Sequence, residues 1–333
     1  MIFPNLNPTL FHQLSVATRG YCVVHALAVV LLISITNSTC AQVPRLPADG
    51  RVPFEVSAEN GVWMKFVWFP PGKFMMGEPI KAHTEPDDPV TYGGPVSGQH
   101  EVLLSSGFWF GQTEVTQSQW RKVMQTEPWS EQVNVQTGDN FPATYISWYD
   151  AVEFCKRLTQ IERSKGKLSA NQEFCLPTEA QWEYACRAGT TTCYSFDESE
   201  AALSEYAWFD MHFSREQFAH EVASKKPNPA GLYDIYGNCS EWCLDGYSPS
   251  LKGGTNPMSD GVVLKVHRGG NWAISSGLCS YNRYWARPKL RNSASGFRVT
   301  IRPIEEEVSP DASSLKKRWN GGKKREKLEK NSN

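Results

Sequence analysis

The sequence predicts an α+β fold in which short strands and a few helices are joined by many loops. Three observations point to this class. The 333 residues include 12 Trp, 25 Gly and 21 Pro, long periodic runs are few, and strand-like and helix-like stretches follow one another without a repeat. Hydrophobic residues make up 40% of the chain, enough for a core, which excludes a wholly disordered protein. The formal net charge of −1 excludes a globally basic protein that binds nucleic acid.

The first elements expected are short apolar strands. Residues 66–69 and 74–76 flank a Pro-Pro-Gly turn, and both stretches are rich in aromatic and apolar side chains. Residues 79–100 are polar and contain several Pro and Gly, which predicts an exposed loop. Strand character returns at residues 102–104 and 108–110. The N-terminal part of the domain therefore reads as a set of antiparallel strands.

Three helices are expected in the middle of the chain, each behind a residue that can cap its first turn. These caps are Thr116, Ser147 and Thr178. Apolar residues follow each cap at helical spacing: Trp120, Val123 and Met124; Ala151, Phe154, Cys155 and Leu158; Trp182, Ala185 and Cys186. Beyond Gly189 this periodicity fades. Because no linker or change in composition interrupts residues 54–303, we predict one domain there.

The two ends of the chain are predicted to lie outside this domain. An apolar run at residues 26–35 is followed by small residues around Ala41, which predicts a signal peptide over residues 1–41 and an exported mature protein, in a periplasm, extracellular space or secretory lumen. The alternative is an uncleaved N-terminal membrane anchor; no further membrane segment is expected. Residues 304–333 form a charged tail that we expect to be disordered, the alternative being a surface that binds nucleic acid or another anion.

The nine cysteines do not define a disulfide framework by themselves. Cys22 and Cys40 would leave with the signal peptide, and the remaining seven are an odd number, so at least one is unpaired within the chain. An oxidising compartment permits disulfides, but the sequence assigns no pair. We expect most of these cysteines to be buried packing residues.

Several motifs, in the same order as in known relatives, resemble the formylglycine-generating enzyme, or sulfatase-modifying factor, family. They are residues 69–77, 113–116 with Trp120, 146–151, 176–185, 231–238, 241–242, 268–272 and 296–299. Each motif alone is weak, but their order across most of the chain is specific. The resemblance implies a loop-rich fold similar to that of C-type lectins.

The resemblance also implies copper-dependent oxidation, but this chain has only one of the two cysteine ligands that bind the copper ion. The family's founding enzymes oxidise a cysteine in sulfatases to formylglycine and hold Cu(I) between two cysteines, because a soft monovalent ion prefers soft thiolates. Here the first position is Ile274 and the second is Cys279. We therefore predict a module that binds a peptide or protein ligand, such as a sulfatase, without copper oxidation. The alternatives are a formylglycine-generating oxidase with an altered catalytic site at Cys279, or Cys279 as a packing residue.

The same region supplies candidates for ligand binding. Arg283 and Arg287 match family arginines, and aromatic residues between positions 272 and 285 are expected to line a groove with them. Trp285 is the aromatic candidate for substrate binding. The competing interpretation places these rings in the core, and for Trp272 we favour the core.

A calcium site is the second feature that the resemblance implies. The matching positions are Asp234 and Glu241, which supply side-chain oxygens, and Gly237 and Cys239, which supply backbone carbonyls. The alternative is a calcium-free turn in which Asp234 caps its own loop.

Other chemistries find little support. The histidines are scattered without the H-x-H or H-x-x-H spacing of a zinc site, and no G-x-S-x-G elbow is present. A third class of function is that of a structural component in a larger exported assembly. A finding that the basic tail is needed to retain the protein on a partner would favour this class.

Overall fold

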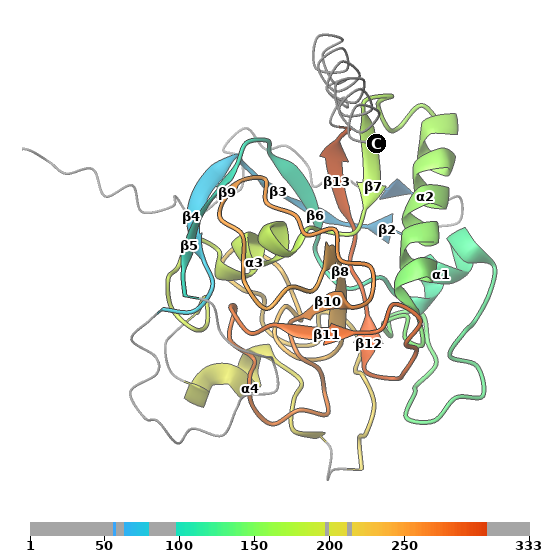
Figure 1. The fold of residues 1–333 in the computed structure, drawn as a ribbon. Coiled ribbons are helices and arrows are strands. Elements are labelled where there is room, and N and C mark those ends of the chain that lie inside the picture. Colours follow the sequence, from blue (N-terminus) through green and yellow to red (C-terminus); the bar gives the residue numbers. More distant parts are fainter. Residues whose placement is uncertain (1–55, 58–62, 80–97, 197–199, 212–214, 305–333) are drawn as a thin grey trace, which may run out of the picture. The chain divides into compact units, whose positions relative to one another are not determined.

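A computed structural model describes residues 56–57, 63–79, 98–196, 200–211 and 215–304 (Figure 1). The predicted signal peptide and the charged tail beyond residue 304 lie outside these residues. Within them, no helix has the length and apolar character that crossing a membrane requires.

Strands from both halves of the domain pair in one antiparallel sheet with the order β3-β6-β13-β7 (Figure 1). Its strands are β3 (Phe66–Phe69), β6 (Phe108–Gly111), β13 (Thr300–Pro303) and β7 (Gln172–Cys175). Because the last described strand lies between an early and a middle one, this sheet closes the domain. The predicted strands at residues 66–69 and 108–110 are confirmed.

A second sheet, with the order β11-β10-β8-β12, positions the candidate site. Its strands are β8 (Ser240–Gly246), β10 (Lys265–Arg268), β11 (Tyr284–Ala286) and β12 (Ser295–Gly296). The three neighbours β11, β10 and β8 are antiparallel, whereas β12 runs parallel to β8. The predicted groove residues after position 280 thus lie on or near an edge strand.

The remaining strands form a hairpin-based sheet and a two-stranded pair. The sheet has the order β4 (Gly72–Met76), β5 (His100–Leu104), β9 (Gly254–Thr255), and the pair joins β1 (Val56–Ser57) to β2 (Trp63–Met64). Most of the predicted loop between β4 and β5 lies outside the described residues.

The three predicted helices are confirmed, with their predicted caps. They are α1 (Gln117–Met124), α2 (Trp148–Ser164) and α3 (Glu179–Arg187), behind Thr116, Ser147 and Thr178. In each, the cap side chain accepts a hydrogen bond from the backbone N–H of the third helical residue, and the side chain of that residue accepts one from the backbone N–H of the cap. A short helix, α4 (Leu203–Tyr206), follows a 3-10 turn at Glu200–Ala202 and was not expected.

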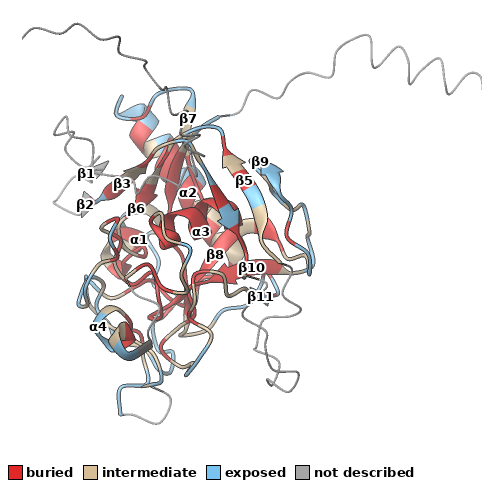
Figure 2. Cartoon of the chain, turned by 90° about the vertical axis from the view of Figure 1, so that its left-hand side faces the viewer, coloured by how far each residue is buried: buried red, intermediate tan, exposed pale blue. Residues whose placement is uncertain are grey.

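The core is built largely from aromatic side chains. Trp120 stacks on Phe154 with ring centroids 5.5 Å apart, and Phe297 meets both rings edge-on. All nine residues of α3 are buried, and Figure 2 shows α3, β8 and β10 coloured mostly as buried. A helix buried on all sides must find partners for its charged side chains, and those partners shape the candidate site.

Strand β10 also buries a histidine that remains neutral. His267 is 5% exposed, its ring lies 3.6 Å from that of Trp242, and its Nε2 has no hydrogen-bond partner. Burial lowers the pKa of His267 from 6.5 to about 3. The unfolded chain therefore binds a proton below pH ~6.5 that the folded chain excludes.

This difference in proton binding between the folded and unfolded chain predicts that His267 makes the protein less stable in acid. Because the unfolded state binds more protons, His267 should lower the free energy of unfolding by about 2 kcal/mol between pH 7 and pH 5. In the variant His267→Phe, which keeps a ring against Trp242, this loss should disappear. Urea unfolding at both pH values measures the difference. An identical pH dependence in the two proteins would contradict the assignment.

Candidate functional site

Helix α3 carries two acidic side chains and one basic side chain on one face. Glu179, Glu183 and Arg187 follow one another at intervals of four residues, so they project from the same side. Glu183 accepts a hydrogen bond from Nε of Arg187 at 2.8 Å and also binds Arg268 of β10. Glu179 binds Arg283 through both oxygens, at 2.6 and 2.8 Å. The helix therefore fixes β10 and the segment that leads into β11.

These ion pairs lie in the interior. Glu183 and Arg268 are fully buried, and Glu183 also accepts the backbone N–H of Gly77 at 2.8 Å. Burial alone would raise the pKa of Glu183, but the charges of Arg187 and Arg268 outweigh it and lower the pKa below its ordinary value. The carboxylate is thus held ionised between two guanidinium groups.

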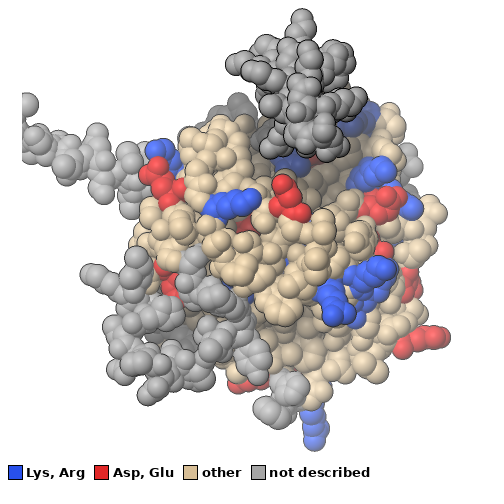
Figure 3. Space-filling view, in the orientation of Figure 1, with Lys and Arg blue, Asp and Glu red and all other residues tan. Residues whose placement is uncertain are grey.

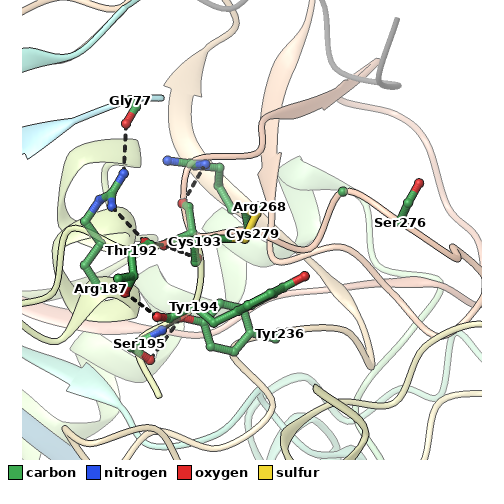
Figure 4. Close-up of a disulfide and its surroundings, with 12 residues drawn as sticks. Gly77, Arg187, Thr192, Cys193, Tyr194, Ser195, Tyr236, Arg268, Ser276 and Cys279 are labelled. Carbon is green, nitrogen blue, oxygen red and sulfur yellow. Dashed lines mark hydrogen bonds between the residues drawn. A yellow bond between two sulfur atoms is a disulfide. The ribbon is translucent and has the colours of Figure 1, made fainter. Parts of the chain in front are cut away.

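A disulfide joins Cys279 to Cys193, two residues that are 86 positions apart in the sequence and have their Cα atoms 4.7 Å apart. Figure 4 shows this bond with Arg187 and Arg268 nearby. Arg187 donates to the carbonyl oxygen before Cys193 at 3.3 Å, and Arg268 donates to the carbonyl oxygen after Cys279 at 3.2 Å. The disulfide is therefore tied to the ion pairs of α3.

This bond corrects the expectation for Cys279. The sequence assigned no disulfide and offered Cys279 as a catalytic residue or as a packing cysteine, whereas the structure pairs it with Cys193. No free thiolate is present at this position while the bond stands. The packing expectation is confirmed for five other cysteines, which are free and buried: Cys155, Cys175, Cys186, Cys239 and Cys243.

Apolar side chains surround the position of the other copper ligand. Ile274 is partly buried and packs against the main core cluster. A methyl group built on Gly270 would lie only 2.6 Å from the side chains of both Ile274 and Leu278. These two side chains thus close over Gly270, whose φ of +72° suits glycine.

Some of the predicted ligand-binding residues are exposed, whereas others are held by contacts within the protein. Trp285 is 49% exposed on the edge strand β11, and its ring lies 6.0 Å from that of Tyr247. Arg287 is also exposed. Arg283 instead lies over Tyr247 at 5.0 Å while its guanidinium binds Glu179. Trp272 is 4% exposed, which confirms its placement in the core.

An open pocket adjoins this surface. Arg283 and Glu179 line it together with apolar residues that include Leu251 and Met258. Cys279 is not among the lining residues. Arg283 therefore connects the aromatic surface at Trp285 and Tyr247 to the pocket.

The pocket holds a buried carboxyl group that the sequence analysis missed. Asp245 accepts the backbone N–H of Glu179 at 2.8 Å and that of Ser259 at 3.1 Å. Burial, and then the charge of Glu179, raise the pKa of Asp245 to about 7. The pocket therefore changes charge near neutral pH, a property common at functional sites.

The four predicted calcium ligands lie in one loop and in the strand that follows it. Gly237 has φ of +79°, and a side chain there would meet the carbonyl oxygen of Trp208 at 2.3 Å, so only glycine fits. Asp234 is 2% exposed and accepts the N–H of Ala223 at 2.7 Å through Oδ2, while its Oδ1 has no partner. Asp234 thus offers one oxygen to a hard cation.

Glu241 fits the calcium set less well. Its Oε1 binds Arg298 at 2.6 Å, and its Oε2 accepts from Arg298 and from Trp182, both at 2.7 Å. The guanidinium group of Arg298 in this position already neutralises the negative charge of the Glu241 carboxylate. The predicted four-residue set therefore fits calcium only in part.

A further acid lies close to this loop and was also missed. Glu114 is fully buried, its Oε1 accepts from the side chain of Asn238 at 3.0 Å, and its Oε2 has no partner. Burial, and then the charge of Asp234, raise the pKa of Glu114, and burial raises that of Asp234 to about 6. Glu114 belongs to the motif at residues 113–116, but nothing in the sequence indicated that it meets a loop more than 100 residues away.

Charges on the visible surface do not form a patch of one sign. On the face seen in Figure 3, Lys and Arg are interspersed with Asp and Glu among uncharged atoms. This face offers no basic stripe of the kind that tracks a nucleic-acid backbone.

Comparison with known proteins shows what this chain is similar to. It is 25% identical over 210 residues to the chaperone protein LppX of Paenibacillus barcinonensis, covering 51% of this chain and 71% of that one. It is 29% identical over 188 residues to the formylglycine-generating enzyme of Streptomyces coelicolor, which spans 48% of this chain and only 52% of the enzyme. The solved structure of Treponema denticola variable protein 1 superposes with a TM-score of 0.60 at 29% identity, covering 76% of this chain and all of that one.

The family model of the sulfatase-modifying factor enzyme 1-like domain matches residues 54–303, the span predicted for the domain. This match covers most of the chain, and it agrees with the named relatives, the order of the motifs and the loop-rich α+β fold. The chain belongs to the sulfatase-modifying factor family, whose members include the formylglycine-generating enzymes.

Proposed function

We propose that this protein is an exported member of the family that binds a peptide ligand and does not oxidise it with copper. The observation that carries the proposal is the bond between Cys279 and Cys193. The sulfur that would act in the family's chemistry is consumed in this bond.

The surroundings of Cys279 support the loss of the copper site. Two thiolates are needed to bind Cu(I) between soft ligands. Ile274 stands at one of the two positions, and its side chain packs with Leu278 over Gly270. An apolar side chain supplies no ligand, and reduction of the disulfide would restore only one of the two family thiolates.

The exposed aromatic surface supports a binding role. Trp285 is half exposed and lies beside Tyr247. Arg283, which lies over the ring of Tyr247, connects this aromatic surface to the pocket that it lines. Aromatic and arginine side chains are enriched at sites that bind peptides and proteins. Because β11 is an edge strand among the described residues, it can also pair with an extended peptide. One relative is named a chaperone, which is also a binding function.

The proposal of export rests on the signal-like N-terminus and gains support from the disulfide. Structural disulfides persist mainly in oxidising compartments such as the periplasm or the secretory pathway.

Peptide binding at Trp285 can be tested on an array of extended peptides that includes the sulfatase motif. The full mature chain should bind a defined set, and Trp285→Ala should lose that set because truncating a central aromatic residue removes much of the binding energy. Tyr149→Ala is the matched control, since Tyr149 is exposed to a similar degree, 51%. Failure to find any peptide whose binding depends on Trp285 would contradict the proposed site.

A further inference from the structure

The pocket beside Arg283 has a buried part and an exposed rim. The buried part is formed by residues that are at most 8% exposed: Met76, Glu179, Ala180, Asp245 and Leu251. The rim includes three exposed residues: Ser250, Lys252 and Met258. The carboxyl group of Asp245 therefore lies inside a pocket that a ligand can enter from solvent.

Backbone groups alone hold Asp245 in place. Its Oδ2 accepts the N–H of Glu179 at 2.8 Å, and its Oδ1 accepts the N–H of Ser259 at 3.1 Å. Among the described residues, no Lys, Arg or His side chain forms an ion pair with Asp245. Each carboxylate oxygen can accept a further hydrogen bond. The carboxyl group is thus oriented, but it has no cation that balances its charge.

The guanidinium group of Arg283 is committed to Glu179. It donates to both carboxylate oxygens of Glu179, at 2.6 and 2.8 Å, and to the carbonyl oxygen of Ser248 at 2.8 Å. A two-point ion pair of this kind neutralises both partners. Arg283 and Glu179 therefore add little net charge to the pocket.

Two lysines near Asp245 are also bound elsewhere. Nζ of Lys252 donates to the carbonyl oxygen of Met258 at 3.2 Å, on the exposed rim. Lys265 feels the charge of Asp245, but its Nζ donates to the carbonyl oxygen of Leu244 at 3.1 Å, and it does not line the pocket. Neither ammonium group occupies the space beside the Asp245 carboxyl group.

The lack of a cation agrees with the titration of Asp245. Burial, and then the charge of Glu179, raise its pKa to about 7. The nearby thiol of Cys243 stays neutral, because burial raises its pKa well above 9.0. A cationic ligand would favour the ionised carboxylate, so its affinity should rise with pH through this range.

The lining of the pocket suits a primary ammonium group on an apolar stem. Leu251 and Met258 offer apolar surface along which the methylene groups of a lysine side chain can pack. The ammonium group has three donors, and Ser248 and Ser259 add hydroxyl acceptors to the carboxylate. A guanidinium group fits less well, because both oxygens of Asp245 already accept a backbone N–H.

We propose that this pocket binds the ammonium group of a lysine side chain, with Asp245 as its counter-ion. The lysine belongs to the peptide that we place at Trp285, because Arg283, two residues away from Trp285, lines the pocket. The inference rests on the proposed function for the source of the lysine, but not for the chemistry of the pocket. It defines the ligand as an extended peptide with a lysine next to the segment at β11.

Titration of the full mature chain with n-butylamine tests the pocket directly, with the amide signals of Ala180 and Ser259 followed by NMR. This amine stays protonated at pH 6 and pH 8, because its pKa resembles that of lysine, about 10.4. We expect saturable shifts that 1-butanol, a neutral molecule with the same stem, does not cause. The affinity should be about tenfold higher at pH 8 than at pH 6, because Asp245 is mostly ionised only at the higher pH.

Two variants make the test specific. Asp245→Asn should weaken binding of n-butylamine at pH 8 by at least about tenfold and remove the pH dependence. Asp260→Asn is the matched control, because it removes the same charge from the same loop at an exposed residue that does not line the pocket. Its affinity should stay within about twofold of the wild type. If Asp245→Asn does not fold, the pH dependence of the wild type still decides.

The results separate this inference from the proposed function. The lysine pocket is overturned if n-butylamine causes no saturable shift, if 1-butanol binds equally well, or if the affinity is the same at both pH values. It is also overturned if peptides that depend on Trp285 bind equally well after their lysines are replaced by norleucine, a result that leaves peptide binding intact. Binding of n-butylamine as described, without any peptide that depends on Trp285, would support the pocket and contradict only the proposed function.

Discussion

Replacing Cys193 and Cys279 together by alanine is expected to lower the free energy of unfolding by about 4 to 5 kcal/mol. The disulfide closes a loop of 86 residues, and a cross-link of that length restricts the unfolded chain strongly. It also joins two segments that lie outside the strands, beside the backbone hydrogen bond from the N–H of Ser280 to the carbonyl of Cys193 at 2.8 Å. Urea unfolding under non-reducing conditions measures the difference between the variant and the wild type.

Reductant provides the internal control for this result. A dithiol should destabilise the wild type to about the level of the double variant and should leave the double variant unchanged. Cys155→Ala, which removes a free buried cysteine, should remain sensitive to reductant. A wild-type protein whose stability does not respond to reductant would show that Cys279 is not paired with Cys193.

Glu183→Ala is expected to destabilise the protein by about 3 to 5 kcal/mol, because it removes the buried anion that two buried guanidinium groups share. Arg187 and Arg268 are each at most 2% exposed and both bind Glu183. Glu183 also accepts the N–H of Gly77, so the residue that follows β4 loses an anchor as well. Urea unfolding at pH 7 measures the loss.

The matched control for this prediction is an ion pair on the surface. Glu101 binds Lys73 at 3.0 Å, but both side chains are more than half exposed. Glu101→Gln should therefore change the free energy of unfolding by less than about 1 kcal/mol. Equal effects of the two substitutions would mean that the ion pairs of α3 are not buried as described.

Features that depend on neighbouring residues were predictable from the sequence. The caps Thr116, Ser147 and Thr178 each bond to a residue three positions away, so the helix starts are visible in the sequence alone. The short strands around the Pro-Pro-Gly turn follow from local apolar composition for the same reason. Helix α4 has only four residues and no side-chain cap, which left no local sign of its presence.

The site could be predicted only in part because its contacts join distant segments. Cys193 and Cys279 are 86 residues apart, and Glu179 and Arg283 are 104 residues apart. The resemblance correctly drew attention to positions 274–287, but it could not reveal that Cys279 is bonded or that Arg283 is bound by α3. Spacing along the chain carries no information on which residues from separate loops meet.

The ion pair of Glu241 illustrates the same limit. A motif match assigns Glu241 a role from its position, whereas the structure gives both of its oxygens to Arg298 and Trp182. Asp245 and Glu114 were missed because each is a single acid without a distinctive neighbour in the sequence. Their burial and raised pKa values identify them only in the folded protein.

The mass of a sulfatase-motif peptide tests the central claim most directly. The purified protein is incubated with Cu(I), oxygen, a thiol reductant and the peptide, and the peptide is then weighed by mass spectrometry, with an active formylglycine-generating enzyme as the positive control. We predict an unchanged mass, since Ile274 supplies no thiolate and the reductant can free only one of the two family thiols, that of Cys279. Loss of the mass that separates a thiol from an aldehyde, abolished by Cys279→Ser, would contradict this account and establish an oxidase centred on Cys279.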